Sequence, residues 1–276
     1  MKFEIDKIIK MGKSHSLHCE DDLFIEENDN FILCAVFDGC SSGIDSHYAS
    51  TKHKYLLNDV NHYYKMLWKD DMSLTSIEDI LRSYVYSIYV NLLNERYKVN
   101  EEMLSTIVLC FINKQTNEYG IIFCGDGCCC VNNEDISIHD PNGNAVWYLS
   151  SIVDRHYEND LFEEYFAKCK IYSGYIEPSD TICISTDGIE SFMTKYGSHN
   201  GEFPKKVFFH TEELPEKYHN WKMERLYNVL SKGLLPDMNK EGISNIDDLT
   251  IIKIKTFEEN ENKDINKSSE IQTENG

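Results

Sequence analysis

Val36-Phe37-Asp38-Gly39 and Ser185-Thr186-Asp187-Gly188 are the two stretches that decide the fold. In each of them, an Asp-Gly pair ends a β-branched or apolar run that is typical of a buried strand. A third acidic pair, Asp247-Asp248, stands directly before the strand-like run Leu249-Thr250-Ile251-Ile252. Carboxylates at three strand ends, brought together by one fold, would form an all-oxygen site for hard divalent cations. The alternative for any single pair is a simple turn, which is the commonest use of Asp-Gly.

The composition indicates a globular protein with an acidic surface. The chain has 276 residues, of which 41% are hydrophobic and 12% aromatic, which is enough for a sizeable core in one or two domains. The formal net charge of −20 argues against binding to nucleic acid or to an anionic membrane, because phosphate contacts need clustered Lys and Arg. No segment is apolar enough to cross a bilayer, and the N-terminal residues lack the apolar core of a secretory signal. We therefore expect a cytoplasmic protein with no nucleic-acid or membrane partner.

The chain contains ten cysteines, and the absence of an export signal predicts free thiols in a reducing compartment. No CxxC spacing occurs, so a structural zinc site is not expected. The run Cys128-Cys129-Cys130 is interpreted as buried strand residues, because consecutive strand residues alternate between faces and cannot all reach one ion.

The secondary-structure pattern favours an α+β fold. Strand-like segments cover residues 3–9, 23–27, 31–37, 106–112, 119–124, 128–131, 136–138, 181–185 and 249–254. Helical spacing covers residues 46–68, 77–92, 159–168 and 221–230, and the second of these helices follows the capping-box pattern Thr75-Ser76-Ile77-Glu78. Strands come in clusters and helices in pairs without regular βαβ alternation, which indicates antiparallel sheets. Apart from residues 159–168, the segment 141–173 gives little signal. We expect a folded domain over residues 1–256 and a disordered, acidic tail over residues 257–276.

Six motifs together resemble a known family. In chain order they are Cys19-Glu20-Asp21-Asp22, Val36-Phe37-Asp38-Gly39, Leu104-Ser105-Thr106-Ile107-Val108, Cys124-Gly125-Asp126-Gly127, Ile184-Ser185-Thr186-Asp187-Gly188 and Ile246-Asp247-Asp248-Leu249-Thr250-Ile251-Ile252. This series resembles the metal-dependent serine/threonine protein phosphatases of the type-2C (PPM) family. That family carries, in the same order, Asn/Met-Glu-Asp, an Asp-Gly strand end, a Thr-Thr strand, Gly-Asp-Ser-Arg, Ser-Asp-Gly and Asp-Asn-hydrophobic-Thr/Ser. The resemblance covers residues 12 to 255 and implies an antiparallel β-sandwich flanked by α-helices, in four αββα layers.

The resemblance also implies a role for each acidic residue. Asp38 would bridge two Mg²⁺ or Mn²⁺ ions, and the carbonyl of Gly39 would complete the shell of the second ion. Asp187 and Asp247 would hold the first ion, while Glu20 and Asp21 would act around the second ion through bound water. Asp126 would join Asp187 at a third, weaker metal position. The implied catalytic residues are therefore Asp38, Asp187, Asp247 and Asp21, and the implied metal ligands are Asp38, Gly39, Asp187, Asp247, Glu20 and Asp126.

The implied activity is hydrolysis of phosphoserine or phosphothreonine by a water that is activated between the two metal ions. No side-chain nucleophile is needed for this reaction, so the cysteines are not candidate nucleophiles. The expected partner is a phosphorylated protein substrate, and the expected state of the chain is a monomer.

The sequence departs from the family pattern among the residues that would hold the substrate. Ser16 stands where the family has an Arg that grips phosphate, and Lys13, His15 or His18 could supply a replacement cation. Gly127-Cys128 replaces the Ser-Arg of the fourth motif. Cys40 follows Asp38-Gly39, where some members have a His proposed as general acid, and His47 is a candidate substitute.

Two alternatives to an active phosphatase remain open. One is a catalytically weak pseudophosphatase of the same fold that acts as a regulatory binding module. The other is an unrelated acidic interaction domain whose Asp-Gly pairs are all turns.

Overall fold

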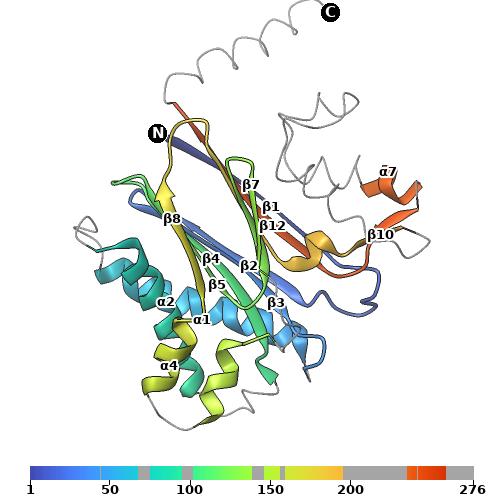
Figure 1. Ribbon diagram of the computed structural model, residues 1–276, viewed down its shortest axis with the longest axis horizontal. Coiled ribbons are helices and arrows are strands. Elements are labelled where there is room, and N and C mark those ends of the chain that lie inside the picture. Colours follow the sequence, from blue (N-terminus) through green and yellow to red (C-terminus); the bar gives the residue numbers. More distant parts are fainter. Residues whose placement is uncertain are drawn as a thin grey trace, which may run out of the picture.

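A computed structural model of the chain describes residues 1–43, 45–67, 75–94, 102–138, 146–155, 159–194, 235–240 and 242–258. Its centre is a pair of five-stranded antiparallel sheets that pack face to face (Figure 1). The first sheet has the order β1 (Lys2–Lys10), β12 (Leu249–Phe257), β9 (Thr181–Ser185), β6 (Gly127–Val131) and β7 (Glu134–Ile138). The second sheet has the order β2 (Asp21–Glu27), β3 (Phe31–Gly39), β4 (Ser105–Asn113), β5 (Glu118–Cys124) and β8 (Lys170–Tyr175). The expected α+β fold with antiparallel sheets is confirmed.

The second sheet is buried on both faces, which explains why its strands are apolar almost throughout. In β3, Ile32 and Val36 pack in the cluster between the two sheets, whereas Leu33 and Phe37 pack in the cluster under the helices. This alternation follows from the two-residue period of a strand. The sheet therefore forms the middle layer of the described structure.

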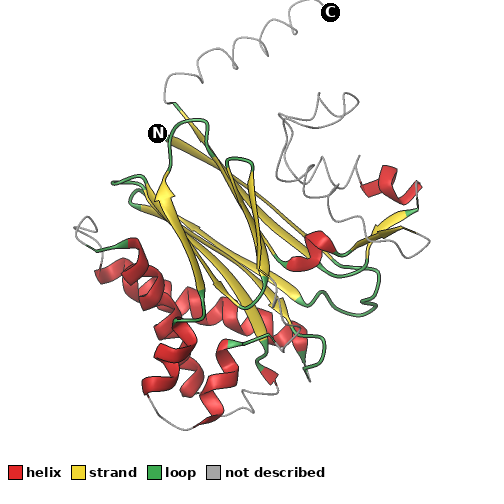
Figure 2. Ribbon diagram, in the orientation of Figure 1, coloured by secondary structure: helices red, strands yellow, loops and turns green. Residues whose placement is uncertain are grey.

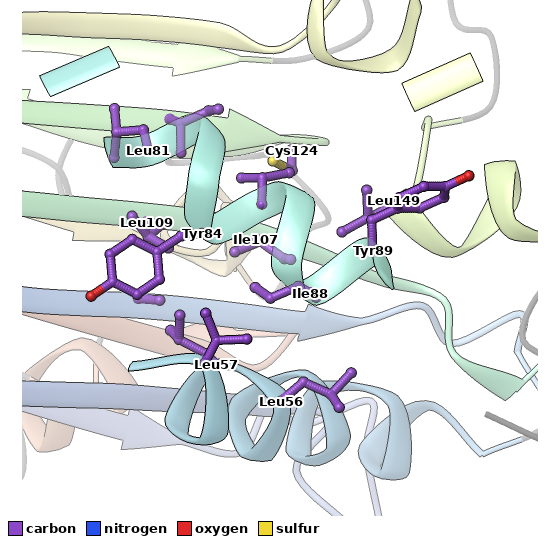
Figure 3. Packing of buried hydrophobic residues seen from close by; sticks show 14 of the residues in the cluster. Leu56, Leu57, Leu81, Tyr84, Ile88, Tyr89, Ile107, Leu109, Cys124 and Leu149 are labelled. Carbon is purple, nitrogen blue, oxygen red and sulfur yellow. The ribbon is translucent and has the colours of Figure 1, made fainter. Parts of the chain in front are cut away.

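Helices cover the outer face of the second sheet (Figure 2). They are α1 (Ser46–Leu67), α2 (Ile77–Leu93), α4 (Asn159–Phe166) and the 3₁₀ helix η1 (Leu149–Arg155). Leu57 of α1 and Tyr84 of α2 meet Leu109 of β4 in the packed cluster (Figure 3). The remaining elements are the 3₁₀ helix η2 (Asp187–Glu190), the short helix α7 (Leu235–Lys240) and the paired strands β10 (Phe192–Thr194) and β11 (Ile243–Asn245).

Helix α2 begins at Ile77, as the helical spacing predicts, but its N-cap lies one residue later than the capping-box pattern implies. Its N-cap is Ser76, whose Oγ accepts a hydrogen bond of 3.1 Å from the backbone N–H of Asp79. The Ser76 hydroxyl in turn donates to Asp79 Oδ2 at 2.6 Å. The pattern that implies a cap at Thr75 was wrong by one position, and the reciprocal bond of a capping box is replaced by one between the Ser76 hydroxyl and the Asp79 carboxylate.

Several expectations fall at or beyond the limits of the described residues. The helix expected at residues 221–230 lies outside them, so a helical layer on the outer face of the first sheet stays a prediction. Strand β12 continues through Phe257, the first residue of the expected tail, and the tail beyond residue 258 also lies outside the described part. The domain boundary therefore stays a prediction as well.

Helix α1 carries a buried histidine that makes stability depend on pH. His53 is fully buried, and its Nδ1 lies 2.8 Å from the carbonyl oxygen of Ala49. Burial lowers the pKa of His53 to about 4, against 6.5 for an unperturbed histidine. Below about pH 6.5 the unfolded chain takes up a proton at this residue, whereas the folded protein keeps the ring neutral until about pH 4. Burial of His53 therefore costs nothing above about pH 6.5, and the free energy of unfolding falls as the pH drops from there toward about 4.

We expect His53→Gln to remove this pH dependence. The difference in unfolding free energy between wild type and variant should shrink by about 2 kcal/mol between pH 7.5 and pH 5, because only the wild type must exclude a proton from this site. Urea denaturation at the two pH values measures the difference directly. A difference that does not change with pH would contradict the burial of a neutral His53.

Candidate active site

The cross-strand register places residues from three of the six motifs side by side at one edge of the second sheet. Asp38, near the end of β3, pairs with Asp21 at the start of β2 and with Thr106 of β4. The next residue, Gly39, donates its N–H to the carbonyl oxygen of Glu20 at 3.1 Å. A Cβ atom on Gly39 would lie 2.1 Å from the carbonyl oxygen of Ser46, so only glycine lets the chain pass here. The motif Asp-Gly thus ends a strand against the start of α1.

The first sheet brings its own carboxylates to the same edge. Asp187 begins η2 directly after β9, and Asp247 precedes β12. A Cβ atom on Gly188 would lie 1.6 Å from the carbonyl oxygen of Asp248, so the Asp-Gly pair is needed for close approach of these two segments. Both Asp-Gly pairs therefore mark places where backbones touch, and neither is a simple exposed turn.

A hydrogen bond connects the two sheets beneath the site. The Thr186 hydroxyl donates to Asp21 Oδ2 at 2.8 Å, and the backbone N–H of Thr186 donates to the carbonyl oxygen of Thr250 at 3.1 Å. Asp21 is only 6% exposed. Asp21 is therefore buried behind the site, where its hydrogen bond from Thr186 links the two sheets.

The acidic residues open onto one cleft of about 140 Å³. Its lining residues are Glu20, Asp38, Gly39, Cys40, Ser41, Thr106, Asp126, Tyr148, Asp187 and Asp247. All six residues that the resemblance implies as metal ligands are among them. Of the four implied catalytic residues, only Asp21 lies behind the cleft wall. Among the described residues that line this cleft, none is a lysine, an arginine or a histidine.

The carboxylates are held close enough to oppose one another's ionisation. The pKa of Asp38 is raised well above its usual range, first by burial and then by the charges of Asp21, Asp187, Asp247 and Asp126. Burial raises the pKa of Asp21 to about 8, although its hydrogen bond from Thr186 works in the other direction. Both shifts arise because burial and the neighbouring carboxylates disfavour the ionised forms of these two residues.

This donor set fits Mg²⁺ or Mn²⁺. The cleft offers carboxylate and carbonyl oxygens, which are the ligands that hard divalent cations prefer. Within the described part of the chain, no three Asp, Glu, His or Cys side chains converge tightly enough to form a closed metal cage. A closed cage is not required for Mg²⁺, which keeps several waters and binds through one or two carboxylates.

Asp248 is a residue that sequence reasoning left without a role. Its side chain is 1% exposed and accepts hydrogen bonds from two backbone N–H groups, that of Gly12 at 2.7 Å and that of Glu20. Asp248 Oδ2 also lies 2.8 Å from Nδ1 of His15. Asp248 is therefore a buried structural residue, whereas the Asp247 side chain is 47% exposed and faces the cleft.

His15 belongs to this acidic cluster. Its Nε2 lies 3.7 Å from Glu20 Oε2 and 3.7 Å from Asp247 Oδ1. Partial burial lowers the pKa of His15, but Asp248, Glu20 and Asp247 outweigh that effect and raise it overall. Of the three candidate replacement cations, His15 is thus the one that the structure places against the site carboxylates.

The other histidine candidates lie elsewhere. His18 and His47 stack on each other with ring centroids 4.3 Å apart, and neither lines the cleft. Tyr148, which sequence reasoning missed, does line it. Burial raises the pKa of Tyr148, and Cys40, Asp126 and Asp38 raise it further, so its hydroxyl stays protonated at neutral pH. No local pattern pointed to Tyr148, because it lies in a segment without clear periodicity.

The comparisons with known proteins agree with this geometry. A family model described as protein phosphatase 2C matches residues 11–231. The chain belongs to the protein phosphatase 2C family. A search of curated proteins finds no match.

Solved structures of this protein phosphatase 2C fold resemble the chain at low identity. RsbX in complex with magnesium is 17% identical, with 92% of this chain and 95% of that chain covered and a TM-score of 0.52. The catalytic domain of the serine/threonine phosphatase PstP with two manganese ions is 13% identical, with 93% and 99% covered and a TM-score of 0.54. A serine/threonine phosphatase from S. agalactiae is 14% identical, with 92% and 100% covered and a TM-score of 0.56. These likenesses concern the fold. None of the described helices has the length and hydropathy that crossing a bilayer requires.

Proposed function

We propose that this member of the family is a Mg²⁺- or Mn²⁺-dependent phosphatase that hydrolyses phosphoserine and phosphothreonine in proteins. The observation that carries the proposal is the cleft into which both sheets direct carboxylates, among them Asp38, whose ionisation is opposed by four neighbouring carboxylates. A cluster of acidic groups whose ionisation is opposed by burial and by mutual repulsion gains most when divalent cations bind. A phosphorylated protein is the proposed partner, whereas a monomeric state and a cytoplasmic location stay predictions.

The proposed ligands are the six residues that the family resemblance implies. Asp38 is assigned to both ions, the Gly39 carbonyl and Glu20 to one, Asp187 and Asp247 to the other, and Asp126 to a weaker third position. When bound, two such ions lower the pKa of a water between them and offset charge on the phosphoryl oxygens. Asp21 supports this set from below through its hydrogen bond from Thr186, and Asp248 fixes the backbone of Glu20.

The decisive experiment is a phosphatase assay with the purified full chain. We expect hydrolysis of a phosphothreonine peptide and of p-nitrophenyl phosphate in the presence of Mn²⁺ and none after chelation. Activity that survives chelation would contradict the proposal.

One observation favours the pseudophosphatase as a second candidate. Ser16 replaces the phosphate-gripping Arg, and the described residues that line the cleft include no basic side chain. Calorimetric Mn²⁺ binding without turnover would identify this alternative, whereas absence of both would favour an unrelated acidic domain. The retained carboxylates of the cleft support the active enzyme.

Tyr148 is a candidate donor to the substrate phosphate. Tyr148 lines the cleft, and a neutral hydroxyl there can donate a hydrogen bond to a phosphoryl oxygen. A hydrogen bond to a charged group contributes about 1.5–3 kcal/mol, so we expect Tyr148→Phe to lower kcat/KM by about tenfold to a hundredfold. Steady-state kinetics measure this, with circular dichroism as the control for folding. An unchanged kcat/KM would remove Tyr148 from the site.

The missing arginine gives another prediction. Ser16→Arg should lower KM for a phosphate ester by about one to two orders of magnitude, because a guanidinium adds a charge-assisted contact worth about 1.5–3 kcal/mol. The turnover number should change less, since the contact serves the substrate and the transition state alike. Ser16→Lys is the matched control, because it adds charge without the bidentate geometry. An unchanged KM for the arginine variant would mean that position 16 does not face the bound phosphate.

A further inference from the structure

Two thiols face each other at the end of the β5–β8 ladder. The Sγ atoms of Cys124 and Cys169 are 3.7 Å apart, and both cysteines are free. The last paired residues of the ladder are Phe123 and Lys170, so the two cysteines occupy opposite positions one step further in the same register. Opposite residues of antiparallel strands have Cα atoms about 4.5–5.5 Å apart, which lies within the range of about 4.4–6.8 Å found for disulfides. The backbone geometry therefore suits a disulfide.

The surroundings give the two thiols different access to solvent. Cys124 is fully buried and points into the cluster under the helices (Figure 3), whereas Cys169 is partly exposed just beyond the end of α4. The Cys169 thiol donates to the carbonyl oxygen of Tyr165 at 3.6 Å, which holds its sulfur over Cys124. A small oxidant can therefore reach the Cys169 thiol directly, whereas the Cys124 thiol is buried beneath it.

Tyr165 is the buried polar side chain that lies against both thiols. Tyr165 is 2% exposed, and the contact that its hydroxyl makes among the described residues is with the thiol of Cys124. The titratable groups that surround this hydroxyl are the two thiols of Cys124 and Cys169. A thiol is a weak hydrogen-bond partner, so this buried hydroxyl is poorly satisfied while both cysteines are reduced. An oxygen added to Cys169 would supply an acceptor there.

Two other cysteine pairs also stand opposite each other, but both members of each pair are buried. Cys34 pairs with Cys110 between β3 and β4, and Cys130 pairs with Cys183 between β6 and β9. Oxidation of cysteine requires an accessible sulfur. These pairs therefore serve as internal controls for the exposed one.

We propose that Cys124 and Cys169 form a hydroperoxide-reactive dithiol that closes to a disulfide. The Cys169 thiolate attacks one oxygen of the peroxide, breaks the O–O bond and becomes a sulfenic acid, while the other oxygen leaves as hydroxide and is protonated to water. The Cys124 sulfur then attacks the Cys169 sulfur and expels its oxygen, which leaves as a second water with the proton from Cys124. Two thiols are oxidised by two electrons, and one peroxide is reduced to two waters.

The disulfide would act on the candidate cleft, and this consequence rests on the proposed function. It closes the segment 125–168, which contains the cleft residues Asp126 and Tyr148. The sulfurs must approach from 3.7 Å to about 2.0 Å, and Cys124 is only two residues from Asp126. Since a misplacement of about 1 Å at a reacting centre can cost about a hundredfold in rate, we expect a loss of phosphatase activity of at least about tenfold on oxidation.

The test compares the wild-type full chain with Cys169→Ser before and after hydrogen peroxide. Excess peroxide is removed, free thiols are blocked by alkylation, and digested peptides are analysed by mass spectrometry. We expect one cross-linked peptide pair that contains Cys124 and Cys169. Its mass should be lower than the sum of the two reduced peptides by the mass of two hydrogen atoms, and it should disappear after treatment with dithiothreitol. Cys183→Ser is the matched control and should form the same cross-link as the wild type.

Each outcome bears on a separate part of the proposal. Absence of the cross-link in the wild type would overturn the site, as would a dominant link between Cys34 and Cys110. Activity should fall reversibly in the wild type and persist in Cys169→Ser, and since Cys40 lies at the cleft in both proteins, its own oxidation cancels in this comparison. A cross-link without loss of activity would overturn the effect on the cleft. If the reduced wild type has no phosphatase activity, the proposed function fails, but the mass spectrum still decides whether the disulfide forms.

Discussion

Asp38→Asn should lower kcat/KM for a phosphothreonine peptide by at least about a thousandfold. The carboxylate of Asp38 is the proposed ligand of both ions, and metal-ion stabilisation of developing charge supplies several kcal/mol, where about 4 kcal/mol corresponds to a thousandfold. Asp29→Asn is the matched control, because Asp29 is an exposed residue of the same type just before the opposite end of β3. Retention of more than about a tenth of wild-type activity by the Asp38 variant would contradict its assignment.

Asp38→Asn should make the metal-free protein more stable, although it lowers activity. Because burial and neighbouring carboxylates raise the pKa of Asp38 in the folded state, its ionised form destabilises the fold at every pH above its unfolded pKa of about 4. A neutral Asn removes that penalty. In metal-free buffer at pH 7.5, Asp38→Asn should therefore unfold at a higher temperature than the wild type, and Mn²⁺ should stabilise only the wild type. If thermal unfolding shows the variant to be the less stable protein without metal, the repulsion argument fails.

Asp248→Ala should cost about 3–5 kcal/mol of unfolding free energy. Its buried carboxylate accepts from the backbone N–H groups of Gly12 and Glu20 and lies 2.8 Å from His15 Nδ1, so its removal leaves two backbone N–H groups without their acceptor and His15 without its nearest carboxylate. Urea denaturation at pH 7.5 measures the loss. Asp247→Ala is the matched control: its side chain is half-exposed, so it should change stability by less than about 1 kcal/mol while it removes activity.

If the roles of Asp247 and Asp248 were exchanged, the effects of the two variants on stability and activity would be exchanged as well. A stable Asp248→Ala protein with no activity, beside a destabilised Asp247→Ala protein, would show that Asp248 is the residue of the catalytic cleft. Comparing both variants therefore tests the two roles more sharply than either variant does alone.

The sequence predicted the parts of this protein that depend on local patterns. Asp38-Gly39 and Asp187-Gly188 lie at strand ends because apolar, β-branched runs precede them. Their glycines are needed because backbones from distant segments approach within the space of a Cβ atom. Motif order then sufficed to bring the implied ligands into one cleft, since the family's order of strands determines which ends meet.

The features that the sequence did not predict depend on contacts between distant segments. Asp247 and Asp248 are chemically identical neighbours, and only the position of Gly12 and His15 makes the second one structural. Strand β8 escaped prediction because it pairs at one edge of the sheet and is only partly buried, so its residues lack clear alternation. Tyr148 reaches the cleft from a connection without periodicity, and the pairing of Cys124 with Cys169 follows from the β5–β8 register alone.

The most direct test of the central claim is the number of Mn²⁺ ions that the full chain binds at pH 7.5, measured by isothermal titration calorimetry. We expect two ions for the wild type, with a weaker third at high concentration, and loss of measurable high-affinity binding in Asp38→Asn. Asp29→Asn should bind as the wild type does. A wild-type chain that binds no Mn²⁺, or an Asp38→Asn chain that still binds two ions with wild-type affinity, would contradict the assignment of this cleft as a two-metal centre.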